Sequence, residues 1–332
     1  MADIAKEAEV QADERAVVGV SRMANYLWNE VWKRGDKTAE GDADALHDMR
    51  VAIRRLRSLL QNFEGESKSK NSAPILNSKL RNEFREQRAE LGKLGDVLGF
   101  VRDHDVLDEY LKTYSETRLK IKLNAKATEY SGLLVFERFL QNERASAFAP
   151  MVKRLNKSRR ADALQEEFAR WALGLPGASA PDISLREIAH KLLPIRLDEI
   201  ASYASSLEDG HAESEQHELR KSLRRLRYTF ETLAPCFDAD IKPIVKKLVA
   251  LQDLLGEMQD RAVLHDKALE AFGARMTPAE STPESALPEI IPADVAAFLK
   301  YGSDRRGRLL SQVRALWKEH QAENLFENLR AL

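Results

Sequence analysis

Histidine and arginine recur twice in this sequence with the same spacing. The segment HDMRVAIRRLRSLL begins at His47, and the segment HELRKSLRRLRYTF begins at His217. In both segments arginines follow the histidine at the third, seventh and tenth positions. Guanidinium groups bind phosphate oxygens through paired hydrogen bonds and keep their charge at any cellular pH. These residues therefore predict a surface that binds an anion.

Helical geometry turns this spacing into a surface ridge. At about 100° per residue, the apolar residues between Met49 and Phe63 fall within an arc of about 120°, which predicts a core face. The histidine and three arginines fall within a neighbouring arc of about 80°. The predicted ridge residues are His47, Arg50, Arg54, Arg57, His217, Arg220, Arg224 and Arg227, with Lys221 and Tyr228 at the edge of the second ridge.

The crowding of arginines on each ridge has an energetic cost. Like charges four residues apart on a helix repel by a few tenths of a kcal/mol per pair. A repeated penalty indicates that a negative partner offsets it. The alternative is a solvent-exposed face whose arginines pair with nearby acids, an arrangement that contributes little. The position of both ridges beside a core face favours the wall of a groove between helices.

A second repeated pattern contains glycine and aspartate. Asp96, Gly99 and Asp103 share one helix face in LGDVLGFVRDHDVL, and LQDLLGEMQDRAVL repeats the pattern from Asp253 to Asp260. A glycine on a helix contact allows a neighbouring backbone to approach closely. The carboxylates can then accept paired hydrogen bonds from guanidinium groups and fix their direction.

A second basic stripe precedes these acidic positions. Its residues are Arg81, Arg85 and Arg88 in the first half of the chain, loosely matched by Lys242 and Lys246 in the second. They are predicted to extend the anion-binding surface. The alternative is an ordinary scatter of charge over a helix surface.

The elements that position these residues are predicted to be helices throughout, because the apolar pattern has helical period and Gly and Pro are rare over long stretches. Polar or proline-rich breaks occur at 64–74, 173–182 and 273–294. The repeated motifs predict a duplication, with repeat one at 10–172, a linker at 173–182 and repeat two at 183–325. The fold class is therefore all-α, built from two helical bundles.

Composition limits the remaining classes of function. The 332 residues carry 52 Lys and Arg against 53 Asp and Glu, so an electrostatic function requires segregation of charge. Cys236 is the sole cysteine, which excludes an internal disulfide. The first residues lack the apolar stretch of a signal peptide, and no segment has the length of a membrane span. We expect a cytoplasmic protein without a cofactor or a metal; the oligomeric state is left open.

Together these segments make the chain similar to a known family. HDMRVAIRRLRSLL, RDHDVL, HELRKSLRRLRYTFE and LQDLLGEMQD resemble the CHAD family, the conserved histidine α-helical domain, over residues 10–325. The resemblance implies a single CHAD domain of two four-helix-type bundles, related by a pseudo-two-fold axis around a central basic groove. It also implies non-catalytic binding of inorganic polyphosphate by the ridge residues, and association with polyphosphate granules. Gln259 stands where the first half has Arg102, so the halves need not bind equally.

A metal-dependent phosphohydrolase is the first alternative. His-Asp pairs occur at His47, His104 and His265. A metal site requires such pairs to converge, and adjacent residues on one helix point about 100° apart.

Nucleic-acid binding is the second alternative, since nucleic acids are also polyanions. Single-strand binding uses aromatic side chains interleaved with basic ones. None of Trp28, Trp32, Trp171 and Trp317 lies on a predicted ridge, which favours a ligand without bases.

Overall fold

The computed structural model describes residues 4–64, 76–123, 128–160, 163–272 and 291–332. These residues form helices joined by short connections, and their one β-type contact is an isolated bridge between Arg15 and Ser184. The prediction of an all-α protein is confirmed.

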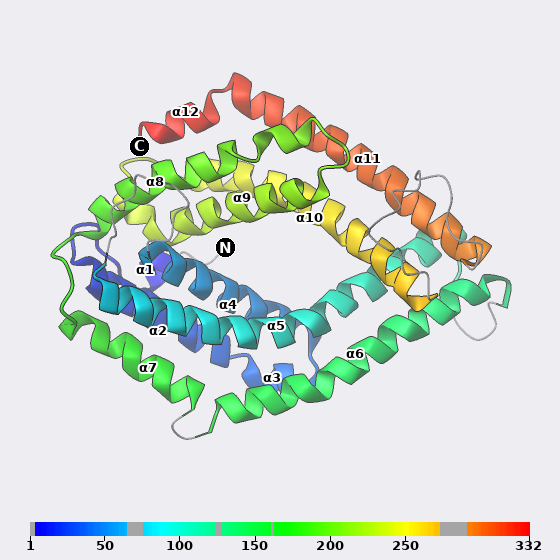
Figure 1. Ribbon diagram of the computed structural model, residues 1–332, viewed down its shortest axis with the longest axis horizontal. Coiled ribbons are helices and arrows are strands. Elements are labelled where there is room, and N and C mark those ends of the chain that lie inside the picture. The colour runs from blue at the N-terminus through cyan, green and yellow to red at the C-terminus, as the bar shows by residue number, and fades with distance from the viewer. Residues whose placement is uncertain (1–3, 65–75, 124–127, 161–162, 273–290) are drawn as a thin grey trace.

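Long helices dominate the architecture (Figure 1). The α-helices are α1 (Ile4–Glu7), α2 (Ala16–Trp32), α3 (Gly35–Glu40), α4 (Ala43–Glu64), α5 (Ser78–Tyr114), α6 (Ser131–Ser158), α7 (Leu164–Gly174), α8 (Leu185–Ala201), α9 (Glu213–Leu233), α10 (Lys242–Ala271), α11 (Ala293–Ala322) and α12 (Leu325–Arg330). The short elements are a π-helix, η1 (Ser115–Leu119), and the 3₁₀ turns η2 (Thr128–Tyr130), η3 (Leu175–Gly177), η4 (Ala204–Leu207) and η5 (Ala234–Cys236).

The packing of helices in the first half is repeated in the second. Helix α2 packs on α4, α4 on α5 and α5 on α6; likewise α8 packs on α9, α9 on α10 and α10 on α11. Helix α7 lies against α2 as α12 lies against α8, and α4 packs directly on α9. The order of packing is thus matched between the two halves, while the repeat bounds, the two-fold axis and the central groove stay predictions.

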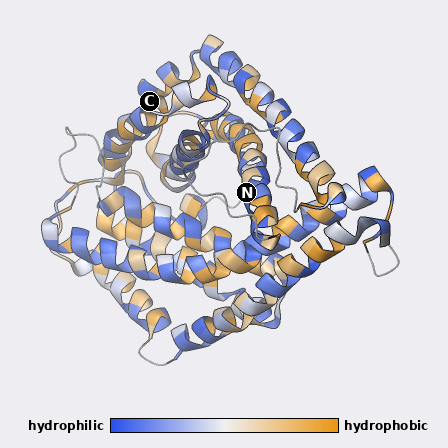
Figure 2. Cartoon of the chain, turned by 45° about the vertical axis from the view of Figure 1, so that its right-hand side comes forward, coloured by the Kyte–Doolittle hydropathy of each residue, from blue (hydrophilic) through white to orange (hydrophobic). Residues whose placement is uncertain are grey.

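The predicted core faces are buried. Met49, Ile53 and Leu56 of α4 and Leu219 and Leu223 of α9 are fully inaccessible to solvent. Figure 2 shows hydrophilic and hydrophobic residues sharing the same helices, as amphipathic packing requires. The hydrophobic effect thus orients α4 and α9 and leaves their arginines beside the core.

The apolar interior consists of two clusters, and the boundary between them crosses the long helices instead of separating the two halves. The larger cluster joins α2, α4 and α5 to α8, α9 and α10. A second cluster lies where the far ends of α5, α6, α10 and α11 meet, and it includes Phe136 and Phe298. Both clusters therefore contain residues from both halves.

The predicted breaks can be compared only in part. Apart from Glu64, which ends α4, the predicted loop at 64–74 lies outside the described residues. The predicted linker 173–182 begins with the end of α7 and the turn η3. In the proline-rich segment 273–294, residues 273–290 lie outside the described residues and α11 begins at Ala293. Packed residues extend from Ile4 to Leu329, and the predicted domain bounds stay predictions.

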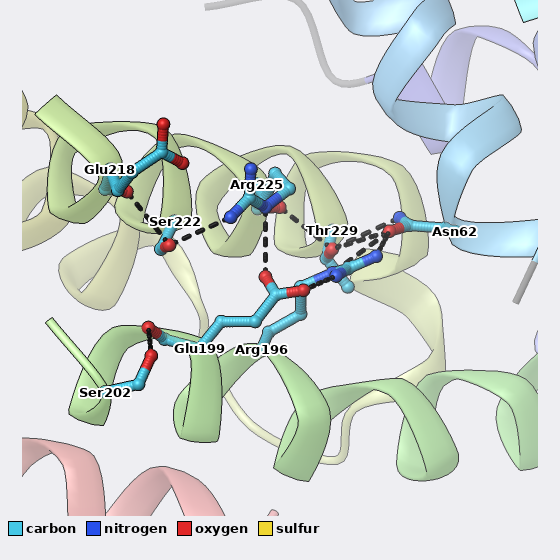
Figure 3. A network of polar contacts seen from close by, with 8 residues as sticks. All are labelled: Asn62, Arg196, Glu199, Ser202, Glu218, Ser222, Arg225 and Thr229. Atoms are coloured by element: carbon cyan, nitrogen blue, oxygen red, sulfur yellow. Dashed lines mark hydrogen bonds and ion pairs between the residues drawn. The ribbon is translucent and has the colours of Figure 1, made fainter. Parts of the chain in front are cut away.

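A buried polar network ties the two halves together (Figure 3). Arg196 of α8 is 1% exposed, and its Nη2 donates a hydrogen bond to Asn62 Oδ1 of α4 at 2.8 Å. Its Nη1 donates to Glu199 at 2.6 Å, and Glu199 also accepts from Arg225 of α9 at 2.9 Å. Asn62 donates to Thr229 Oγ1 at 3.1 Å. One amide therefore connects three helices from both repeats.

Asn62→Ala is expected to lower the free energy of unfolding by about 2 kcal/mol, because it removes a buried acceptor from a buried guanidinium. Denaturant unfolding followed by circular dichroism measures this. Asn156→Ala, at an exposed position of α6, is the matched control and should change stability by less than about 0.5 kcal/mol. Equal effects of the two substitutions would show that the network does not stabilise the interface.

Candidate functional site

The two predicted ridges meet where α4 packs on α9. The positive charges of Arg50 on the same helix and of Arg220 and Arg227 on α9 lower the pKa of Arg54. The charges of Arg54 and Arg220 lower the pKa of Arg224 in the same way. We call these five residues, Arg50, Arg54, Arg220, Arg224 and Arg227, the guanidinium cluster. The ridges therefore face each other, as a shared binding surface requires.

Burial makes this cluster electrostatically unfavourable. Burial, followed by the neighbouring cations, lowers the pKa of Arg54, and it lowers the pKa of Arg224 to about 10. Among the described residues no carboxylate forms an ion pair with either guanidinium, and the Nε atom of Arg54 is buried without a hydrogen-bond partner. The Tyr228 side chain is 2% exposed, and Arg227 Cζ lies over its ring, 4.8 Å from the ring centroid. The centre of the cluster thus carries uncompensated positive charge.

The glycine and aspartate pattern positions the outer arginines. Arg50 Nη1 donates to Asp103 Oδ1 at 2.6 Å. A Cβ atom at Gly99 would lie 3.2 Å from Arg50 Nη2, and one at Gly256 would lie 3.7 Å from Arg220 Nη1. The prediction that these glycines admit a neighbouring backbone is wrong, because the neighbouring groups are guanidiniums. The flat groups fit against a helix surface that lacks Cβ atoms.

The aspartates of the repeated pattern have different neighbours. Asp96 attracts Arg57, whose pKa is lowered mainly by burial. Burial and then the charge of Asp103 raise the pKa of Asp260, whereas Arg220 opposes this rise. Asp103 of α5 and Asp260 of α10 therefore approach each other beside the cluster. Asp253 is exposed.

The second basic stripe surrounds one buried acid. The Glu64 side chain is 0% exposed; it accepts from Arg85 Nε at 2.9 Å and from Arg88 Nε at 2.6 Å. Arg81 donates to the Glu64 carbonyl oxygen at 3.0 Å. These arginines neutralise Glu64 at the end of α4, so they have a structural role whether or not they also meet a ligand.

The other predicted residues lie in different surroundings. Lys221 pairs with Glu218 at 2.6 Å, and Arg227 lies 3.2 Å from Glu231. Lys242 and Lys246 are exposed on the first turns of α10 and line a separate cavity. Their predicted role in anion binding stays a prediction.

The sequence profile of the CHAD domain matches residues 24–269, which include both ridges. The chain belongs to the CHAD domain family. Two curated relatives are uncharacterized protein Rv2226 of Mycobacterium tuberculosis (strain ATCC 25618 / H37Rv) and uncharacterized protein MT2285 of Mycobacterium tuberculosis (strain CDC 1551 / Oshkosh). Each is 27% identical over 254 residues, which are 74% of this chain and 44% of the relative. The chain thus matches less than half the length of these relatives.

Two solved structures share the CHAD fold of this chain. The CHAD domain from the plant Ricinus communis aligns with a TM-score of 0.57 at 20% identity, covering 97% of this chain and 92% of the other. PptA from Streptomyces chartreusis aligns with a TM-score of 0.61 at 16% identity, covering 93% of this chain and 100% of the other. At these identities the likeness concerns the fold alone.

Each ridge of the CHAD domain begins with a histidine. Burial lowers the pKa of His47, and Arg102 and Arg54 lower it further. Burial also lowers the pKa of His217, assisted by Lys221 and Arg220. Both rings are therefore neutral at pH 7 without a ligand.

Arg102 is a site residue that the sequence interpretation did not assign. Its available signal was its place directly before Asp103 in RDHDVL. In the other half Gln259 lies beside His217, whose pKa it raises, and carries no charge. The surroundings of the two histidines thus differ in charge, and unequal binding by the two halves stays a prediction.

The features expected of the two rival functions can also be located. Within the described ranges, no three His, Cys, Asp or Glu side chains are grouped as metal ligands. Asp48 accepts from Arg34 at 3.1 Å, and Asp105 is bonded to Arg144. Trp28, Trp32 and Trp317 are buried in the apolar core. No helix in the described part of the chain has the length and apolarity needed to cross a membrane.

Arg224→Met is expected to raise the free energy of unfolding of the unliganded protein by about 1 kcal/mol, because it removes a buried, repelled cation. Arg225→Met is the matched control on the next residue of α9. It should lower stability by about 1–3 kcal/mol, since Arg225 is bonded to Glu199. Denaturant unfolding of both variants measures the difference, and a loss of stability in Arg224→Met would contradict the account of the cluster.

The lowered histidine pKa values predict a pH dependence of stability. Below the ordinary histidine pKa of about 6.5, the unfolded chain binds more protons than the folded chain, so stability falls as pH decreases from 7 towards the lowered folded pKa values. Replacing His47 and His217 together by Gln should flatten this fall in thermal melts between pH 7.5 and about 5.5. His211→Gln, at an exposed position, is the control. An unchanged pH profile in the double variant would exclude these two rings as its source.

Proposed function

We propose that this CHAD domain binds inorganic polyphosphate without chemical turnover, through the guanidinium cluster and the flanking residues His47, His217 and Arg57. The observation that carries the proposal is the burial of Arg54 and Arg224 together, with no carboxylate paired to either among the described residues. An anion bound there would lower the free energy of every member of the cluster.

A linear polyanion is the ligand class that best matches the extent of the charge. The cluster and its flanking residues follow the lengths of α4 and α9, so several charges are presented in series. A polyanion that exchanges its counterions for these cations gains affinity from their release, and that affinity falls as salt rises. A single phosphate would neutralise only part of the surface.

Inorganic phosphate chains are favoured over nucleic acids because the predicted ligand residues offer no accessible aromatic ring for stacking. Tyr228 is the aromatic residue among the predicted ligand residues, and its ring is covered by Arg227. Base stacking needs an accessible ring. Guanidinium donors alone suit a polymer whose repeating unit is phosphate.

Binding without turnover is supported by the state of the acidic residues near the ridges. Asp48 and Asp105 are bonded to arginines, and Asp103 is bonded to Arg50. A protein with this activity would act where the polymer accumulates, so we also propose a cytoplasmic location at polyphosphate granules.

The decisive variant reverses both central charges. Arg54→Glu with Arg224→Glu is expected to weaken polyphosphate binding about 10-fold or more at low salt and to reduce the slope of log K against log salt by about two. Arg138→Glu with Arg308→Glu, at exposed positions of α6 and α11, makes the same change in net charge and is the control. Titration calorimetry at several salt concentrations measures both, with circular dichroism to establish folding.

Three outcomes would count against the proposal. Equal binding of polyphosphate by the folded double variant and the control would exclude the cluster as the site. An oligonucleotide that displaces polyphosphate at matched ionic strength would favour nucleic-acid binding. Release of phosphate from polyphosphate in the presence of Mg²⁺ or Mn²⁺ would favour the phosphohydrolase.

A further inference from the structure

A cavity of about 1140 Å³ lies where the N-terminal segment meets the end of α9 and the start of α10. Arg54 and Arg224 do not line it, so it is distinct from the guanidinium cluster. Sites that hold small organic ligands usually have volumes of about 300–1,000 Å³, so this cavity is large enough for such a ligand.

The inner wall of the cavity is apolar. Ala5, Val10, Ile241 and Val245 line it and are at most 9% exposed. The N-terminal part of this wall is fixed by hydrogen bonds: Val10 N donates to the Ala5 carbonyl oxygen at 2.9 Å, and Gln11 N donates to Glu14 Oε1 at 2.8 Å. The wall is therefore formed in advance of any ligand.

Two of the four cationic residues that line the cavity lie on α10. Lys242 and Lys246 line it one turn apart on α10, both are exposed, and neither has an ion-pair partner among the described residues. The first turn of α10 adds the partial positive charge of a helix N-terminus. This end of the cavity therefore favours an anion.

The acidic residues of the lining are largely engaged already. Glu231 lies 3.3 Å from Arg55 and 3.2 Å from Arg227. Asp240 accepts a hydrogen bond from the backbone N–H of Lys242 at 3.1 Å. Glu9 is the remaining carboxylate of the lining. The four cations of the lining, Lys6, Arg22, Lys242 and Lys246, exceed its three carboxylates by one charge.

We propose that this cavity binds an amphipathic anion, with an unbranched hydrocarbon chain against the apolar wall and a carboxylate or phosphate head group at Lys242 and Lys246. Burying a hydrocarbon chain there is favourable because it removes apolar surface from water. An inorganic phosphate chain fits the inner wall poorly, because burying charged oxygens against apolar side chains carries a large penalty.

The proposal is tested on the full chain by calorimetric titration with three probes: dodecanoate, dodecyl phosphate and inorganic tripolyphosphate. The two dodecyl probes, kept below their micelle concentrations, are expected to bind with a stoichiometry of one, and whichever binds more tightly identifies the head group. Lys242→Glu with Lys246→Glu should weaken them about 10-fold or more. Lys300→Glu, at an exposed position of α11, is the control.

A second variant separates this site from the polyphosphate site. Ala239 is exposed and lines the cavity, so Ala239→Trp fills the space without disturbing the core. It should abolish dodecyl binding and leave polyphosphate binding unchanged. Either of two results would overturn the proposal: no saturable dodecyl binding to the wild-type chain, or dodecyl binding that survives both the Ala239 and the double lysine variants. If the double lysine variant lost polyphosphate affinity and kept dodecyl binding, these lysines would be assigned to polyphosphate binding and the cavity proposal would be wrong.

Discussion

Mutual repulsion between buried guanidinium groups is the constraint on which the rest of this structure depends. Arg54 and Arg224 come from different halves of the chain and are brought together by the packing of α4 on α9. Charges of one sign remain close in a poorly solvated place only if stronger interactions hold their helices. The apolar core and the network around Arg196 supply those interactions. Folding thus stores an electrostatic cost at the position where an anion would relieve it.

The neighbouring residues limit that cost without removing it. Asp103 fixes Arg50, and Asp96 attracts Arg57, while the glycines of α5 let these side chains lie flat. Gly256 of α10 does the same for Arg220. The ends of the ridges are therefore partly compensated and their centre is not. Such a gradient directs an anion towards the centre and keeps the arginines extended before it arrives.

Much of this arrangement could be predicted from sequence because it repeats with helical period. The core faces of α4 and α9 and the ridges beside them follow from local spacing. The repeated glycine and aspartate pattern also predicted a carboxylate that holds a guanidinium group, as Asp103 holds Arg50. Other long-range partners could not be predicted. Nothing in the local sequence indicates that Glu64 accepts hydrogen bonds from three arginines. Nor does it indicate that Lys242 and Lys246 line an apolar cavity. Those contacts depend on where separate helices end, which periodicity does not determine.

The two apolar clusters have a consequence for the duplicated architecture. Each draws residues from both halves, and equivalent helices, α4 and α9, touch each other directly. A single half on its own would expose the part of its arginine helix that packs on the other half. Exposed apolar surface favours association, so we expect an isolated half to pair with a second copy of itself. The covalent link between the halves keeps these surfaces together, and it lets the two ridges differ, as they do at Arg102 and Gln259.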